Sequence, residues 1–471
     1  MHLTDLILQN RHLQLLRAEL LRPDGLEHAA YVVFGVSRIA QDPFSKNPRL
    51  RLLVRDVLPV EPDEITSFDA VHISWKTDRL VRLIAQAAQD GQQVGIAHSH
   101  PNGPSRFSAQ DDANEAELIR LTQNRNGGTA LMPSLLFCGN GSIQARVWTG
   151  PSTPIDITTI RTIGSDWRTL RAPELGEVVE DLAFSRQNLA LGPAFNRILR
   201  GLRVGVVGAG GTGSPLVQQL ARMGVGRLAL FDPDHVEMSN LNRLYGATRE
   251  DAEKRRKKVD VIRREVERMN LGTQVVTYDD WIGSQTCREA LKSLDLVFGC
   301  TDDHDGRSLI NRLAYYYLIP VIDLGLALRV SERHGEMRLE ADGRVTVLEP
   351  GATCLICRRI VNPVLAAEEA LRRGDPAEYE RRKAEAYVRG EGNPAPAVIP
   401  FTTSVATMAV EEMIQRLQGF RGQDGTIANR VRRFSFAEDV RPGAAVQPCR
   451  VCGAPHIVGA GDVQPFLGRV G

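Results

Sequence analysis

The spacing of apolar residues divides the first third of the chain into short alternating elements. Apolar residues recur at helical spacing over residues 6–21, and the turn-forming residues 22–25 end that helix. The apolar run 30–36 predicts a strand, and a second helix is expected over 79–89. With further short strands up to Trp148, this pattern predicts an α+β domain over residues 1–152.

The remainder of the chain has a different pattern. Residues 153–183 contain Thr, Arg and Pro with weak periodicity, which indicates a linker. After it, apolar strands alternate with helices of ten or more residues, which is typical of a doubly wound, mainly parallel sheet. The expected elements are strands 202–207 and 227–231 and helices 215–223 and 249–269. Residues 184–471 are therefore expected to form an α/β, Rossmann-like domain.

The composition limits which partners the chain is expected to bind and where in the cell it is expected to act. Lys and Arg number 58 against 57 Asp and Glu, so no overall field attracts nucleic acid or a membrane surface. The N-terminus lacks the pattern of a signal peptide, and no stretch has the apolar length of a membrane span, so a cytoplasmic location is expected. Seven cysteines are an odd number, which argues against a disulfide framework and favours metal binding.

A candidate metal site follows the apolar strand 94–97. His98 and His100 point the same way because side chains alternate along a strand. Asp111 lies at the start of a predicted helix and can supply a third, carboxylate ligand. Two imidazoles, one carboxylate and an open position are typical of catalytic zinc. The alternative is a pair of solvated or core histidines.

The spacing His-x-His-Pro, six residues, then Ser-x-x-Asp resembles the metal motif of the JAB (MPN-type, JAMM) zinc isopeptidases. That family cuts ubiquitin-like proteins from lysine or trims their C-termini. It has an acidic residue just before the strand that follows the first helix, and Glu27 occupies that place. The resemblance implies that Glu27 is the general base, that His98, His100 and Asp111 hold the catalytic zinc, and that Ser108 stabilises the oxyanion.

A glycine-rich turn follows the strand 202–207. It carries Gly-x-Gly-x-x-Gly as Gly208, Gly210 and Gly213, with Gly211 inside it, and the next strand ends at Asp232. Such a turn lets backbone N–H groups and a helix N-terminus approach phosphate, and the acidic residue can hold a ribose hydroxyl. The pattern alone also suits a nicotinamide-dependent oxidoreductase.

The segment 233–243, Pro-Asp-His-Val-Glu-Met-Ser-Asn-Leu-Asn-Arg, resembles the adenylation domain shared by ThiF, MoeB and the ubiquitin-activating enzymes, and the resemblance covers residues 184–453. It implies that Arg186 reaches into the ATP site of a partner protomer in a homodimer. The residues implied to bind the triphosphate are Asn240, Arg243 and Lys258. Lys257 remains an alternative to Lys258. The resemblance also implies that Asp302 binds magnesium, although the family's usual Asn after it is replaced by Asp303.

Two Cys-x-x-Cys pairs occur late in the chain, Cys354 with Cys357 and Cys449 with Cys452. Their type and separation predict a closed, four-sulfur structural zinc site, which the adenylation family also carries, and disulfides are the alternative. Cys138, Cys287 and Cys300 are spaced like core residues.

Activating enzymes that form a thioester have a further cysteine on a crossover loop, here expected near Gly392. No cysteine lies between Cys357 and Cys449. Adenylation without an enzyme-bound thioester is therefore expected, since acyl-adenylate formation depends on positioning and charge stabilisation. Thr402, Thr403 and Ser404, at the start of a helix expected over 403–417, are an alternative acyl acceptor if they do not simply cap the helix.

The combination resembles bacterial fusions of a JAB domain with an activating enzyme, some of which are linked to phage defence. It implies a zinc-dependent peptidase and an ATP- and magnesium-dependent adenylating domain acting on one ubiquitin-like protein, with a conjugating enzyme as partner. Three alternatives remain at this point. They are activation of a sulfur carrier for cofactor or cysteine synthesis, a nicotinamide oxidoreductase with a metal-binding appendage, and a binding scaffold with inactive sites.

Overall fold

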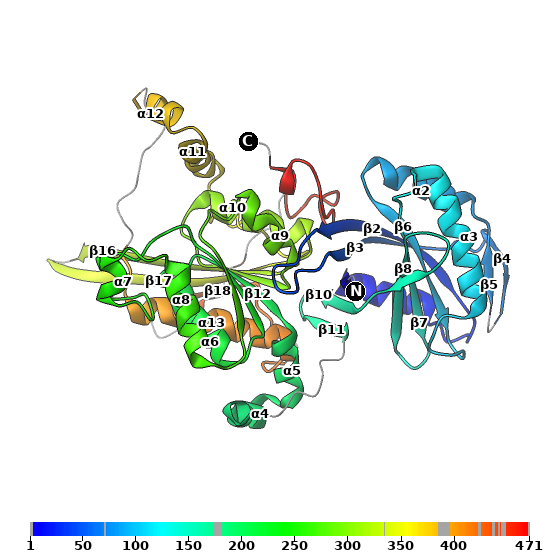
Figure 1. Ribbon diagram of the computed structural model, residues 1–471, viewed down its shortest axis with the longest axis horizontal. Helices are drawn as coiled ribbons and strands as arrows, with labels where there is room; N and C mark the ends of the chain where they lie inside the picture. Colours follow the sequence, from blue (N-terminus) through cyan, green and yellow to red (C-terminus); the bar gives the residue numbers. More distant parts are fainter. Residues whose placement is uncertain are drawn as a thin grey trace.

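The computed structural model places two mixed α/β parts side by side (Figure 1). It describes residues 3–69, 72–172, 181–333, 335–384, 396–422, 425–435, 439–440, 443 and 449–469. Within those residues, no helix combines the length and apolar character needed to cross a membrane.

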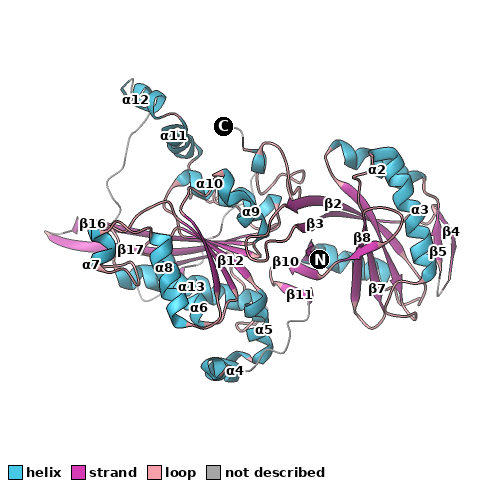
Figure 2. Cartoon of the chain, viewed as in Figure 1, coloured by secondary structure: helices cyan, strands magenta, loops and turns pink. Residues whose placement is uncertain are grey.

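The first part is built on a nine-stranded sheet in the order β11-β10-β1-β3-β2-β6-β7-β8-β9. Helices α1, α2 and α3 cover the sheet (Figure 2). The strands are β1 Leu3–Gln9, β2 Ala29–Ile39, β3 Arg49–Pro59, β6 Gln93–His100, β7 Met132–Cys138, β8 Ile143–Trp148, β9 Pro154–Asp156, β10 Thr159–Ile163 and β11 Arg168–Arg171. The helices are α1 Asn10–Leu20, α2 Asp78–Gln89 and α3 Ala109–Asn126. A separate hairpin pairs β4 Ile65–Phe68 with β5 Ile73–Trp75.

Two expectations for this part are wrong. The helix expected over 6–21 begins only at Asn10, because Leu6, Ile7 and Leu8 belong to β1, which lies between β3 and β10 and is buried on both faces. A continuous apolar run of this length does not distinguish a central strand from a helix. The expected linker 153–183 instead supplies β9, β10 and β11 to the sheet. These strands have three to five residues, too few for clear periodicity.

The second part contains an eight-stranded sheet in the order β14-β13-β12-β15-β16-β17-β18-β19. Neighbouring strands are parallel from β14 through β13, β12 and β15 to β16. The strands β17, β18 and β19 continue the sheet with antiparallel pairing. The strands are β12 Arg203–Val207, β13 Arg227–Phe231, β14 Gln274–Tyr278, β15 Leu296–Gly299, β16 Val321–Arg333, β17 Glu336–Leu348, β18 Asn429–Arg433 and β19 Asp439–Val440. The parallel half confirms the doubly wound fold expected from the alternating pattern.

The second part also contains helices, most of which flank the sheet, while α4 and α12 stand away from it (Figure 2). The helices are α4 Ser185–Leu191, α5 Pro193–Gly201, α6 Gly213–Arg222, α7 Arg249–Glu253, α8 Lys258–Met269, α9 Gln285–Ser293, α10 His304–Tyr316, α11 Pro363–Gly374, α12 Pro376–Ala384 and α13 Ile399–Gln418. The single helix expected over 249–269 is divided into α7 and α8. Between them Arg255 has a φ of 46°, and the Arg256 carbonyl accepts a hydrogen bond from Val236 N–H at 2.8 Å. The break therefore ties the start of α8 to the loop that follows β13.

Candidate functional site

The predicted metal ligands of the first part lie together. His98 and His100 end β6, and Asp111 lies in the first turn of α3. Asp111 Oδ1 is 3.2 Å from His98 Nε2, and Asp111 Oδ2 is 3.5 Å from His100 Nε2. The candidate ligand atoms all lie within 4.8 Å of one another. This donor set, two imidazoles and one carboxylate, fits zinc with a position left for water or substrate.

The start of α3 fixes Asp111. Ser108 is the N-cap, and its Oγ accepts a hydrogen bond from Asp111 N–H at 3.1 Å. Ser108 O–H and Ser108 N–H in turn donate to Asp111 Oδ2 at 2.7 and 2.6 Å. This capping box orients the carboxylate toward the histidines. Ser108, expected at the oxyanion, thus contacts the metal-ligating side chain directly.

A backbone group orients His100 from the other side. His100 Nδ1 is 3.1 Å from the Pro104 carbonyl oxygen, which leaves Nε2 free to face Asp111. An N–H donated to a carbonyl selects the tautomer in which the opposite ring nitrogen is a metal ligand. No residue pattern indicates this contact, because it involves a main-chain oxygen.

Glu27 lies beside the histidines, two residues before β2. Its Oε1 is 3.7 Å from His100 Nε2, and its N–H donates to the Asp69 carbonyl at 2.9 Å. The residue is 5% exposed, and burial raises the pKa of its carboxyl group. Burial also raises the pKa of Asp111, but hydrogen bonds from His100 and His98 outweigh it and hold the pKa well below its usual value. One carboxyl is thus held as an anion, while the other is shifted toward accepting a proton.

The glycine-rich turn joins β12 to α6. Gly208 has a φ of 92°, and a Cβ there would lie 2.7 Å from the Cys300 carbonyl oxygen. A Cβ at Gly213 would lie 1.9 Å from the Gly208 oxygen, whereas a Cβ at Gly210 would meet nothing within 4 Å. The outer glycines are therefore required by the tight turn, and Gly210 leaves the backbone open to a phosphate group.

Asp232 braces this turn from the end of β13. Its Oδ2 accepts a hydrogen bond from Ala209 N–H at 2.7 Å, and its Oδ1 accepts one from Asp234 N–H at 2.9 Å. The residue is 6% exposed, and burial raises the pKa of its carboxyl group. The side chain lies where a ribose hydroxyl would meet the turn in a nucleotide-binding βαβ unit.

Positive and polar side chains surround the same turn. Lys258 Nζ is 2.7 Å from Asp234 Oδ2 and 3.9 Å from Asp232 Oδ1. Lys257 instead pairs with Asp279 at 3.5 Å, so Lys258 is the lysine that lies beside Asp232. The aliphatic part of Arg243 lies against Gly211, where a Cβ would be 3.0 Å from Arg243 Cδ.

Asn240 shapes the segment that carries Arg243. Asn240 Oδ1 accepts a hydrogen bond from Glu237 N–H at 3.1 Å, and the Arg243 guanidinium donates to the Ser239 carbonyl. These contacts close the short turn Met238–Asn240 between β13 and α7.

The two adjacent acids after β15 differ in their contacts. Asp303 caps α10 and accepts a hydrogen bond from Gly306 N–H at 2.7 Å. The Asp302 side chain is exposed. Asp303 is therefore engaged as the cap of α10, whereas the neighbouring Asp302 is exposed.

Arg186 lies apart from this turn. It is exposed on α4, between Leu182 and Leu189, which are 87% and 89% exposed. Leu182 lies in the short 3-10 turn Leu182–Phe184 before α4, and Leu189 shares a face of α4 with Arg186.

The four late cysteines meet as expected. Cys354 Sγ is 3.6 Å from Cys449 Sγ, Cys357 Sγ is 3.5 Å from Cys452 Sγ, and all four sulfurs lie within 4.8 Å of one another. Zinc–sulfur bonds of about 2.3 Å in a tetrahedron give sulfur–sulfur distances of about 3.8 Å. The cluster therefore fits a closed structural zinc site.

The hydroxyl groups at the start of α13 are engaged in the fold. Thr402 is 2% exposed, and its O–H donates to the Ile399 carbonyl at 3.0 Å. Thr403 Oγ1 is 3.1 Å from the Tyr245 hydroxyl, and Ser404 Oγ accepts from Arg432 at 3.1 Å. The crossover position near Gly392 lies outside the described residues.

Comparison with known proteins accounts for both parts of the chain. The sequence model of the ThiF family matches residues 184–451, and that of the prokaryotic homologs of the JAB domain matches residues 9–148. The chain belongs to the ThiF family and carries a JAB-like domain at its N-terminus, as the motifs indicated.

Several curated relatives share the ThiF part. The adenylyltransferase and sulfurtransferase MOCS3 of Danio rerio is 27% identical over 61% of this chain and 56% of that protein. The sulfur carrier protein adenylyltransferase of Thermus thermophilus is 34% identical over 28% of this chain and 48% of that protein. The ubiquitin-like modifier-activating enzyme 5 of Oryza sativa subsp. japonica is 29% identical over 38% of this chain and 44% of that protein. The chain thus spans about half the length of these relatives.

Proposed function

We propose that this chain activates the C-terminal carboxylate of a small ubiquitin-like protein by ATP-dependent adenylation, and that its JAB-like domain is a zinc peptidase acting on the same carrier. The observation that carries the proposal is the presence of both constellations on one chain. One is Glu27 beside the cluster of His98, His100 and Asp111, and the other is the glycine turn with its ring of polar and positive side chains.

In the peptidase, zinc held by His98, His100 and Asp111 would polarise the scissile carbonyl and the attacking water. Glu27 accepts a proton from that water and delivers it to the leaving amine, and burial, which raises the pKa of its carboxyl group, favours the protonated form that this step produces. Ser108 keeps Asp111 oriented and helps to stabilise the oxyanion. Cleavage leaves a free carboxylate at the end of the carrier.

In the adenylating domain, the carboxylate of the carrier attacks the α-phosphorus of ATP, and pyrophosphate leaves. Backbone N–H groups of the turn 208–213 hold the phosphates, while Asn240, Arg243 and Lys258 offset their charge. Asp302 would hold magnesium, which neutralises the departing pyrophosphate. Asp232 binds the ribose.

The adenylating part acts as a homodimer in this proposal. The exposed face of Leu182, Arg186 and Leu189 is apolar at its ends and positive at its centre, which suits burial against a second copy with Arg186 near its triphosphate.

The acyl group passes from the adenylate to an external acceptor, because no cysteine lies between Cys357 and Cys449. A conjugating enzyme is one acceptor. The second candidate function is sulfur-carrier activation, in which sulfide or a persulfide attacks the adenylate. It is favoured by the names of the MOCS3 and Thermus thermophilus relatives, which are a sulfurtransferase and a sulfur carrier protein adenylyltransferase.

One experiment tests the whole proposal. The chain is incubated with a genome-neighbouring protein that ends in glycine, with ATP, and the products are followed by ATP–pyrophosphate exchange and intact-mass spectrometry with and without thiol. We expect carrier-dependent exchange and no thiol-labile adduct on this chain. An absence of exchange would sink the adenylation proposal, and a thiol-labile adduct would overturn the absence of a thioester. A thiol-resistant, base-labile adduct would point to Thr403 or Ser404.

A further inference from the structure

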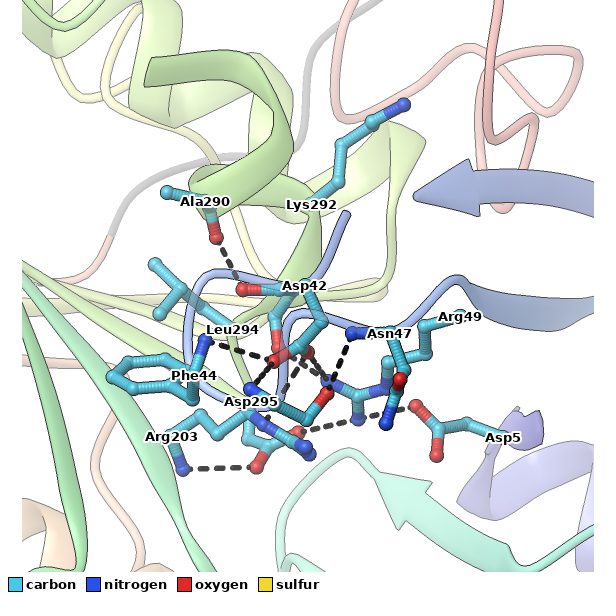
Figure 3. A network of polar contacts seen from close by, with 12 residues as sticks. Asp5, Asp42, Phe44, Asn47, Arg49, Arg203, Ala290, Lys292, Leu294 and Asp295 are labelled. Carbon is cyan, nitrogen blue, oxygen red and sulfur yellow. Dashed lines mark hydrogen bonds and ion pairs between the residues drawn. The ribbon is translucent and has the colours of Figure 1, made fainter. Parts of the chain in front are cut away.

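The JAB-like part joins the ThiF part at the amino ends of the parallel strands. Arg49, at the start of β3, donates to the Ser293 carbonyl at 2.7 Å, and Arg51 donates to the Leu294 carbonyl at 2.8 Å. Arg203, the first residue of β12, faces Asp42 at 3.7 Å. Figure 3 shows the Arg49 and Arg203 side chains beside Asp42, which lies in the loop between β2 and β3. The joint therefore lies at the amino ends of the parallel strands, and the glycine turn lies at their carboxyl ends.

Buried charges hold this joint. Asp295 accepts a hydrogen bond from Arg203 N–H at 3.0 Å and lies 3.8 Å from Arg49 Nη2. Burial raises the pKa of Asp295, but Arg161, Arg49 and Arg203 outweigh it and hold the pKa below its usual value. These buried ion pairs cross from one part to the other, so the two parts cannot separate without breaking them.

Two further contacts restrict rotation about the joint. The segment after Cys452 runs along β2, where Gly461 bridges Val36 and Asp462 N–H donates to the Val36 carbonyl at 2.8 Å. On the other side, Trp167 N–H donates to the Arg416 carbonyl at 2.7 Å. Contacts at three separate places make the two parts one body rather than two domains on a hinge.

The joint also sets the distance between the two candidate sites. Glu27 lies just before β2, and His98 of β6 pairs with Ala29, the first residue of β2. The eleven residues of β2 lead from there to the joint. At about 3.3 Å per residue, β2 alone places the metal cluster about 30 Å from the joint. β12 leads from Arg203 away from the joint to Gly208, which adds about 15 Å. In Figure 1 the two parts accordingly extend in opposite directions from the joint.

We infer that the carrier is released after cleavage and must bind again, at the other end of the molecule, before it is adenylated. This inference rests on the proposed function. Hydrolysis breaks the peptide bond with water and yields a carboxylate and an amine; adenylation then joins that carboxylate to AMP and releases pyrophosphate. The same carboxylate takes part in both steps, and a rigid joint does not bring the two sites together. The chain therefore processes and activates its carrier as two separate encounters.

An isotope-dilution experiment tests the inference on the intact chain. A mass-labelled precursor carrier is supplied with ATP and a tenfold excess of unlabelled mature carrier, and the labelled fraction of the adenylate is measured by intact mass. We expect that fraction to equal the labelled fraction of free mature carrier at every time. Labelled adenylate in excess of that fraction would show direct transfer, within a chain or between protomers, and would overturn the inference.

Two control reactions separate this outcome from failure of the proposed function. The chain must cleave precursor in the absence of ATP and must adenylate mature carrier in the absence of precursor. If either reaction fails, the proposed function is wrong and the inference falls with it. If both succeed, the labelled fraction alone decides between release and direct transfer.

Discussion

Ser108 and Asp111 exchange hydrogen bonds across the first turn of α3. Ser108 O–H donates to Asp111 Oδ2 at 2.7 Å, and Asp111 N–H donates back to Ser108 Oγ at 3.1 Å. A helix cap and a candidate metal ligand are thus the same structural unit. The position of the carboxylate depends on the cap as much as on the histidines that face it.

We therefore predict that Ser108→Ala weakens zinc binding at the first site by about 10- to 100-fold, the usual effect of removing a hydrogen-bond partner of a metal ligand. Peptidase activity at limiting zinc should fall in parallel and recover in part when zinc is raised. Competition with a chromophoric chelator measures the affinity. Ser105→Ala, at an exposed position of the same loop, is the control. Unchanged affinity in Ser108→Ala would show that the cap does not position Asp111.

The four-cysteine cluster is expected to stabilise the joint between the two parts as well as the two Cys-x-x-Cys turns that form it. Cys452 is followed within four residues by Pro455 and His456, whose carbonyl oxygens accept hydrogen bonds from Arg55 of β3. Cys452→Ser, or zinc removal by a strong chelator, should therefore speed proteolysis at the segment that docks on β2. Limited proteolysis with mass mapping tests this, and Cys138→Ser, in β7, serves as a cysteine control outside the cluster. Equal cleavage rates in both variants would contradict it.

Asp295→Asn should destabilise the protein by about 3 to 5 kcal/mol, the usual cost of breaking a buried ion pair from one side. Arg161 and Arg49 would keep their charges in a buried setting without the carboxylate that faces them. Urea unfolding measures the change. Glu117→Gln, which removes the exposed pair with Arg120, should have little effect. If the two variants were equally stable, the buried cluster would not be what holds the joint.

His12 should make stability depend on pH. Burial, with a smaller effect of Arg11, lowers its pKa from 6.5 to about 4, so the imidazole is neutral in the folded chain. Below pH 6.5 the unfolded chain binds a proton that the folded chain does not, so stability is lost as the pH falls from 6.5 toward 4. The full loss is about 3 kcal/mol.

The measurement compares urea unfolding of the wild-type protein and His12→Leu at pH 7 and pH 4. When the pH is lowered from 7 to 4, the wild-type protein should lose up to about 3 kcal/mol more of its free energy of unfolding than His12→Leu does. Titration of the metal-ligating residues affects both proteins alike and cancels in this comparison. A difference that does not change with pH would mean that His12 is solvated or already paired.

The parts of the structure that depend on local motifs could be predicted from the sequence, whereas the joint between distant segments could not. The placement of His98, His100 and Asp111 followed from strand alternation and a helix start, and in the structure their candidate ligand atoms lie within 4.8 Å of one another. The four cysteines meet as their spacing predicted. The joint was not predicted, because the alternation of Arg49 and Arg51 with leucines is typical of a strand with one solvated face. Their partners lie more than 240 positions away, at Ser293 and Leu294, where no local pattern indicates a contact.

Arg186 is predicted to act in the ATP site of the partner subunit of a dimer. If Arg186 completes the ATP site of a second copy, Arg186→Ala and Asp302→Ala should each lose ATP–pyrophosphate exchange. A mixture allowed to exchange subunits should then recover activity, since one of the two sites in a mixed dimer has both groups intact. With random exchange of equal amounts, about one quarter of all sites are complete. Mixing Arg186→Ala with Arg243→Ala, which also removes a group of the triphosphate site, should give the same recovery.

Sedimentation on the same samples provides the independent measurement. We expect a dimer whose formation weakens when Leu182 and Leu189 are both changed to Ser, because these exposed leucines flank Arg186, Leu182 in the turn before α4 and Leu189 on α4. Recovery in the mixture should fall in step with the dimer fraction. A monomer that is fully active in exchange would refute the role of Arg186 across subunits. A stable dimer without recovery on mixing would place Arg186 in its own subunit's site.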